Sequence, residues 1–179
     1  MAGSLELVKK TTSSSNADNV TITDCFTADY DVYVVKYVFE DDSGVANNTF
    51  FRLLDSSNTA ISSGNTYQYA SRNHNSSTEF DVFNSGQNEI FTSYLPDKDL
   101  SLGKERQGVA YVYNPYSSTK YTGVFFQTHG LSTSNEFMAS QGIGMLATAG
   151  VNKGFQVIHS GSGDGIKSGA TIEVYGVKE

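Results

Sequence analysis

The sequence has no tryptophan, two prolines and one cysteine, so no disulfide can form within the chain. A secreted module held together by disulfides is therefore disfavoured. Cys25 lies in an alternating apolar and polar stretch, where a lone cysteine is usually a small buried apolar residue. A chain of 179 residues can bury roughly two thirds of its unfolded surface. We therefore expect one domain, residues 1–179, that folds without disulfides, metal ions or cofactors.

Charged residues are scarce, at 17% of the chain where roughly 25% is usual. Acidic residues outnumber basic ones, and the net charge is -7. Proteins that bind nucleic acid carry basic stripes, whereas the basic residues here are scattered apart from the pair Lys9 and Lys10. The sequence thus predicts no nucleic-acid partner, and solubility accounts for the acidic balance.

Long apolar runs are also missing. No stretch approaches the roughly 20 apolar residues of a membrane helix, and the first residues lack the charged and apolar regions of a signal peptide. From these features we expect no membrane partner and a protein that stays in the cytoplasm where it is made until it is assembled into something larger.

Residues with high strand propensity fill the chain instead. The 11 Tyr, 11 Phe and many Val and Thr residues recur with a period of two, in segments separated by Ser, Asn, Gly and Asp clusters. This spacing is typical of a sandwich or barrel. The predicted strands span residues 5–7, 20–24, 30–39, 48–54, 66–70, 78–83, 89–94, 107–113, 121–129, 142–147, 154–159 and 170–177.

The fold class predicted from this pattern is all-β, a jelly-roll-like antiparallel β-sandwich. Segment 30–39 is apolar on both faces, which predicts a central strand that is covered from both sides. Clusters 55–58 and 62–65 have the composition of turns. Segment 95–106 is interpreted as an irregular connection, because Pro96 and Gly103 leave room for no more than one helical turn.

Residues that could support catalysis are dispersed. His74, His129 and His159 lie in three different segments and form no closely spaced pair; the last two end predicted strands, where we expect them to face solvent. The glycine-rich segment 161–165 is followed by a predicted strand, so it is interpreted as a turn and not as a phosphate loop. The acidic cluster 40–42 lacks the spacing of a calcium-binding loop and is interpreted as a mobile loop tip. No catalytic, cofactor or metal site is predicted.

Tyrosines are the remaining candidates for a binding site. An apolar ring with a polar hydroxyl suits both protein interfaces and contacts with sugars. Tyr111 and Tyr113 share one face of a predicted strand, and Tyr116 follows in the next turn. These three residues are the candidate interface or glycan contacts, although the same pattern also fits tyrosines that line the rim of a core.

Several segments resemble a known group of proteins. They are residues 5–9, 20–23, 30–35, 51–55, 67–69, 154–158 and 168–177, of which the closing strand with its Tyr175-Gly-Val177 ending is the most specific. In this order they are similar to small virion structural proteins of tailed phages, especially T4-like cyanophages. The resemblance implies a β-sandwich on the outside of the virion, as a capsid or tail component, and it transfers no active-site residue.

Three functional hypotheses follow. The favoured one is a non-enzymatic virion protein, assembled in the host cytoplasm, whose partners are other capsid or tail proteins and copies of itself in a homo-oligomer. The alternative is a carbohydrate- or host-receptor-binding module, for which a host glycan would be the partner. A hydrolase with a carboxylate pair that the sequence does not identify is the third.

Overall fold

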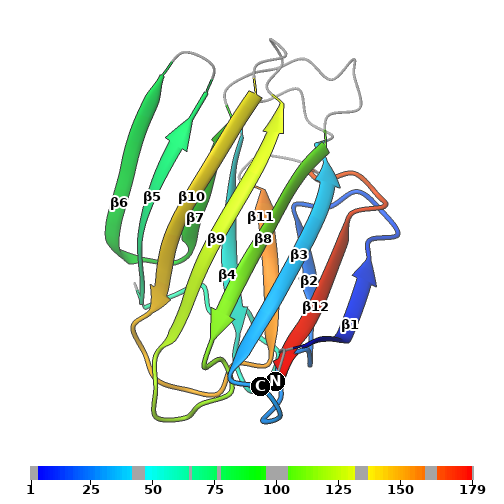
Figure 1. The fold of residues 1–179 in the computed structure, drawn as a ribbon, viewed down its shortest axis with the longest axis vertical. Helices are drawn as coiled ribbons and strands as arrows, with labels where there is room; N and C mark the ends of the chain where they lie inside the picture. The colour runs from blue at the N-terminus through cyan, green and yellow to red at the C-terminus, as the bar shows by residue number, and fades with distance from the viewer. Residues whose placement is uncertain are drawn as a thin grey trace.

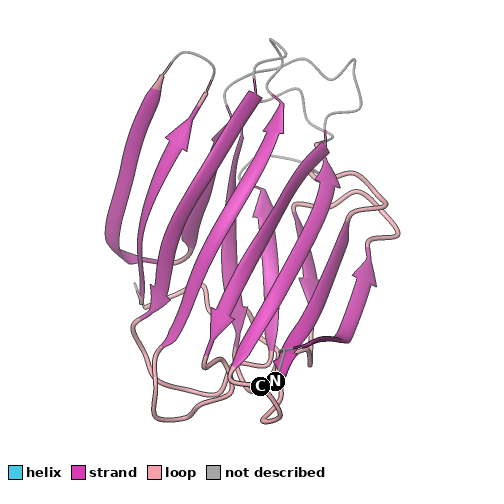
Figure 2. Cartoon of the chain, in the orientation of Figure 1, coloured by secondary structure: helices cyan, strands magenta, loops and turns pink. Residues whose placement is uncertain are grey.

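A computed structural model describes residues 4–41, 47–64, 66–75, 78–95, 105–131, 137–159 and 165–178. These residues form strands, turns and loops, with no helix among them (Figure 2). Each predicted strand overlaps an observed one, so the all-β prediction is confirmed. The strands are β1 (Ser4–Thr12), β2 (Asn19–Ile22), β3 (Val32–Glu40), β4 (Asn47–Leu54), β5 (Tyr67–His74), β6 (Glu79–Gln87), β7 (Ile90–Leu95), β8 (Glu105–Tyr113), β9 (Thr122–Leu131), β10 (Phe137–Leu146), β11 (Gly154–His159) and β12 (Thr171–Lys178).

The strands form two sheets that pack face to face. The larger has eight strands in the order β1-β12-β3-β8-β9-β10-β5-β6, and the smaller has four in the order β2-β11-β4-β7. All pairings between these strands are antiparallel. Successive strands β1 to β5 alternate between the sheets, as in a jelly roll. Figure 1 shows the large sheet in front of the small one. The predicted antiparallel sandwich is confirmed.

Aromatic and aliphatic side chains fill the space between the sheets. Tyr37 of β3 and Phe126 of β9 both make edge contacts with Phe51 of β4, with ring centroids 5.3 and 6.0 Å apart. Phe155 of the neighbouring strand β11 lies 4.8 Å from the same Phe51 ring. These four side chains are fully buried, so rings from both sheets interdigitate at the centre of the core.

Strand β3 departs from the prediction on one point. It lies between β12 and β8, so its position away from a sheet edge is confirmed. Its inner face, with Tyr33, Val35, Tyr37 and Phe39, is buried in the core. The expectation that both faces are covered is wrong for the described residues, because no described element packs over the outer face of the large sheet. The valines on that outer face are shielded instead by side chains of adjacent strands.

Turns form where the composition indicated them. In 55–58, the Asp55 carboxylate accepts hydrogen bonds from the backbone N–H groups of Ser57 and Thr59, at 2.8 and 2.9 Å. Asn58 has a φ of 62° and Gly64 a φ of 84°, which Asn and Gly adopt more readily than other residues. Most of the predicted connection, residues 96–104, lies outside the described residues, as do residues 161–164 of the glycine-rich segment. Within the described part of the chain, nothing has the length and apolar character of a membrane-crossing helix.

Candidate functional site

An apolar row crosses the outer face of the large sheet. Because strand side chains alternate between faces, the register places one outward residue of each strand next to the outward residue of its neighbour. Eight strands at about 4.8 Å spacing give this row a length of about 34 Å. The apolar row consists of Leu7, Tyr175, Val34, Tyr111, Phe125, Ile143, Ala70 and Phe83.

Several residues of the apolar row are well exposed. The exposed fraction is 78% for Phe83, 59% for Ile143 and 54% for Leu7. Single exposed apolar side chains are ordinary, but contiguous exposed apolar patches mark interaction sites. The register aligns these residues in one row, in which Val34 is buried and the other members are partly or well exposed. This makes the outer face the candidate functional surface.

A polar row runs beside the apolar row, two residues away on each strand except β1, where a bulge between Leu7 and Lys9 makes the step three residues. It consists of Lys10, Glu173, Lys36, Val109, Gln127, Gln141, Arg72 and Asp81. Its two ends are ion pairs, with Lys10 Nζ 2.8 Å from Glu173 Oε1 and Arg72 Nε 2.8 Å from Asp81 Oδ1. The hydrogen bond from Arg72 lowers the pKa of Asp81 from its ordinary value. The charges of this row are thus compensated, and neutral side chains occupy its centre.

The three predicted tyrosines do not form one cluster. Tyr111 belongs to the apolar row, and Tyr113 lies two residues further along β8 on the same outer face; both are exposed. Tyr116 is half-buried in the turn after β8. A 3.2 Å hydrogen bond from the Ser117 N–H to the Asn114 carbonyl closes this turn. The structure therefore places two of the three on the candidate surface.

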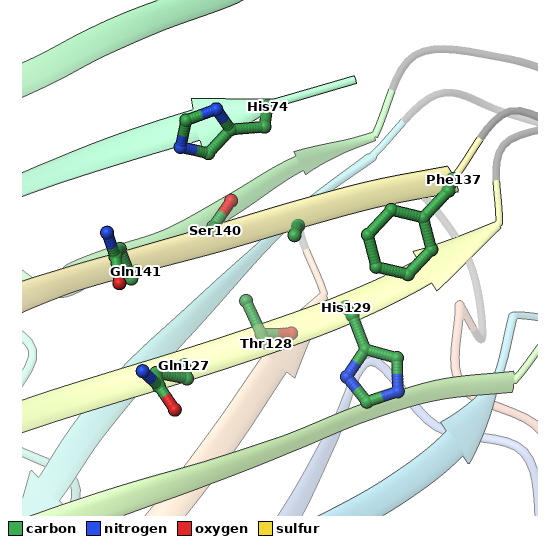
Figure 3. Close-up of a pocket in the computed structure, with 8 residues that line it drawn as sticks. His74, Gln127, Thr128, His129, Phe137, Ser140 and Gln141 are labelled. Atoms are coloured by element: carbon green, nitrogen blue, oxygen red, sulfur yellow. The ribbon is translucent and has the colours of Figure 1, made fainter. Parts of the chain in front are cut away.

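A groove lies along β10 on the same face, and we call it the β10 groove. Its upper part has a volume of about 460 Å³ and is lined on the outer face by His74, Gln127, His129, Phe137, Ala139 and Gln141 (Figure 3). Its lower part has a volume of about 620 Å³ and includes Arg72, Asp81, Phe83, Phe125, Gln141 and Ile143. Gln141 lines both parts. No local pattern in the sequence indicated this groove, because its residues come from β5, β6, β9 and β10.

A buried charged cluster lies inside the sandwich. Asp41, directly after β3, is 2.6 Å from Arg106 Nη2 of β8 and 3.1 Å from His159 Nε2 of β11. Arg106 also donates to the Thr49 hydroxyl of β4 at 2.8 Å. Burial lowers the pKa of Arg106 from its ordinary value, although a guanidinium stays protonated in proteins. The cluster joins the two sheets, and Arg106 and His159 are almost fully buried in it, so its role is structural.

This cluster corrects two expectations. His159 was expected to face solvent, but its side chain is fully buried against Asp41; His129, expected likewise, is exposed. Asp41 was interpreted as part of a mobile acidic tip, but it pairs with two buried side chains; Asp42 lies outside the described residues. Among the residues whose positions are described, no three His, Cys, Asp or Glu side chains come together in a way that could hold a metal ion.

Comparisons with known proteins assign no family to the chain. No protein-family model matches the chain, and no curated protein matches it. Among solved structures, the chain is similar to the crystal structure of the marine PL-14 alginate lyase from Aplysia kurodai. The sequence identity is 8% and the TM-score 0.30, over 86% of this chain and 71% of that chain. A likeness this weak supports no conclusion about the present protein.

Proposed function

We propose that this chain is a non-enzymatic structural protein on the outside of a tailed-phage particle, where its outer sheet face docks onto another particle protein. The observation that carries the proposal is the part of the apolar row that lies over β1, β12, β3 and β8. Exposed apolar side chains such as Leu7 and Tyr111 are costly to leave in water, and a permanent partner that covers this part removes that cost.

The part of the outer face over β1, β12, β3 and β8 fits such a partner best. We call this part the docking half and define it by Leu5, Leu7, Tyr111 and Tyr113, all of which are exposed. Tyrosines are enriched in the cores of protein interfaces, where the ring is buried and the hydroxyl finds a partner. The nearby charges of Lys10 and Glu173 are already paired, so burying this half leaves few charges without a counterion.

Two of the segments that resemble phage virion proteins, the opening and the closing one, lie in the docking half, whereas 20–23, 51–55 and 154–158 fall on strands of the small sheet. The opening segment 5–9 falls in β1 and the closing segment 168–177 covers most of β12, and the two strands pair along most of their length. The two ends of the chain therefore build one continuous surface (Figure 1). This arrangement supports a shared surface role for the two segments.

The test is the protein content of purified particles from the phage that encodes the chain. Mass spectrometry is expected to find the chain in stoichiometric amounts relative to a known capsid or tail protein. Its absence from particles that are complete and infectious would reject the proposal.

A pair of variants tests the docking half. Tyr111→Asp places a charge in the proposed interface and is expected to reduce incorporation into particles at least tenfold. Lys120→Asp introduces the same side chain at an exposed position outside β8 and β9 and is expected to leave incorporation unchanged. Circular dichroism of both purified variants verifies folding. Equal incorporation of two folded variants would contradict docking through this half.

A further inference from the structure

We propose that the β10 groove binds a neutral oligosaccharide. This goes beyond the proposed function and does not depend on it, because the groove lies over β5, β6, β9 and β10 and not over the docking half. The ligand class follows from the shape of the groove, its polar groups, its rings and its charge, which are taken in turn.

The groove is shaped for an extended ligand. Its outward residues on β10 run from Phe137 to Ile143, a distance of about 20 Å at the rise of an antiparallel strand. The small side chains of Ala139 and Ala70 lie along it, while the rings of Phe83 and Phe125 line its lower part. Small residues between larger ones leave a channel that a linear chain of several sugar rings could occupy.

Neutral amides occupy the middle of the groove. Gln127 of β9 and Gln141 of β10 are directly paired across the two strands, and both are exposed. Figure 3 shows their side chains next to each other on the outer face. Neither amide has a hydrogen-bonded side-chain partner among the described residues. Each amide offers two donors and one acceptor, which matches hydroxyl groups, since these also donate and accept.

Exposed rings accompany the amides. Phe137 is 56% exposed, and its ring lies over that of His129 with centroids 6.2 Å apart and an angle of 27° between the planes. At the other part of the groove Phe83 is even more exposed. A sugar ring has apolar C–H faces and hydroxyls at its edge, so it can pack on such rings while its edge hydrogen-bonds to the glutamines.

The charges of the groove argue against other polymers. Arg72 is paired with Asp81, and His74 lies 3.7 Å from Glu79. Among the described residues that line the groove, Arg72 therefore offers no unpaired positive charge to a phosphate. A peptide that binds by adding a strand needs a free sheet edge. The edge strand β6 offers one, but β9 and β10, which carry the middle of the groove, are paired on both sides. A purely apolar ligand would strip water from both amides and leave them without partners.

The experiment measures binding to the full chain. A glycan array that holds neutral hexose and N-acetylhexosamine oligosaccharides beside uronate-containing ones identifies a ligand, and calorimetric titration with a hexasaccharide from the array gives its Kd. Gln127→Ala and Gln141→Ala are each expected to raise Kd about tenfold, as the loss of one or two hydrogen bonds implies. Gln107→Ala is the matched control, because Gln107 lies on β8 outside the groove and hydrogen-bonds to Glu105; its Kd is expected to stay unchanged.

Three outcomes would overturn the inference. They are the absence of any neutral ligand on the array, binding restricted to uronates, and an unchanged Kd for both groove variants. Folding of each variant is verified by its thermal unfolding midpoint, which these exposed substitutions should leave within a few degrees. If the chain binds a neutral oligosaccharide but is missing from particles, the proposed function is rejected while oligosaccharide binding is supported.

Discussion

Asp41 shows how much a single side chain can matter in this sandwich. Its carboxylate compensates the guanidinium of Arg106, a side chain that is almost fully buried, and it also contacts the buried His159. A buried charge that loses its partner is strongly destabilising. An exposed ion pair such as that of Arg72 and Asp81 contributes little, because water already solvates both groups.

At this scale we predict that Asp41→Ala lowers the free energy of unfolding by about 3 to 5 kcal/mol. Asp81→Ala, which breaks the exposed pair, should lower it far less, because water already solvates both groups. Urea denaturation followed by tyrosine fluorescence measures both values. Should Asp41→Ala prevent folding, the milder Asp41→Asn provides the comparison. Equal, small effects of the Asp41 and Asp81 substitutions would show that the buried cluster is not needed for stability.

The contact between β3 and β8 depends on a glycine of β8 that lies directly opposite a large side chain of β3. Tyr37 of β3 is paired with Gly108 of β8, and the buried phenol of Tyr37 occupies the space where a Cβ of residue 108 would lie. The missing side chain therefore lets the ring lie flat against the backbone of the neighbouring strand. Tyr37 then reaches Phe51 of the opposite sheet.

At the scale of these elements we predict that Gly108→Ala destabilises the fold by about 1 to 3 kcal/mol, the usual cost of forcing extra volume into a packed core. Gly150→Ala is the matched control, since no heavy atom lies within 4 Å of the added Cβ; its effect should stay within about 0.5 kcal/mol. Thermal and urea unfolding of the two variants provide the measurement. A Gly108→Ala protein as stable as the Gly150→Ala protein would refute this view of the β3–β8 contact.

The whole molecule buries several groups that lose a proton at high pH. Burial raises the pKa of the Cys25 thiol from 9.0 to about 12, and it also raises the pKa of Tyr37 and of Tyr67 above the ordinary value of 10.0. In the unfolded chain these groups deprotonate at their ordinary values, so above about pH 9 the folded state binds more protons than the unfolded state. Stability must then fall as the pH rises.

We therefore predict that the free energy of unfolding is nearly constant from pH 7 to 8.5 and declines above pH 9. Between its pKa in the unfolded chain and its pKa in the folded chain, each of the three groups lowers the free energy of unfolding by up to about 1.4 kcal/mol per pH unit. Tyr37→Phe removes one of them and should make the decline shallower. Urea unfolding at several pH values tests this, and a stability that stays flat up to pH 11 for the unmodified chain would contradict it.

Alternation alone predicted the location of the strands, because a period of two is a local property that each segment carries by itself. The turn at Asp55 was likewise predictable, since its carboxylate bonds to backbone only a few residues away. Tyr111 and Tyr113 were singled out from the sequence as candidate contacts, and the structure shows both exposed on the outer face; the row that contains Tyr111 was not predicted.

Strand order and register are decided by contacts between segments that lie far apart in the chain, and the sequence does not encode these contacts locally. Only the tertiary structure therefore aligns Leu7 with Phe83 at opposite edges of one apolar row, or places Gln127 beside Gln141 in the β10 groove. The same holds for Asp41, which meets Arg106 and His159 because the end of β3, the start of β8 and the end of β11 lie together. Local pattern determined the elements, and their long-range pairing determined every surface that the proposals use.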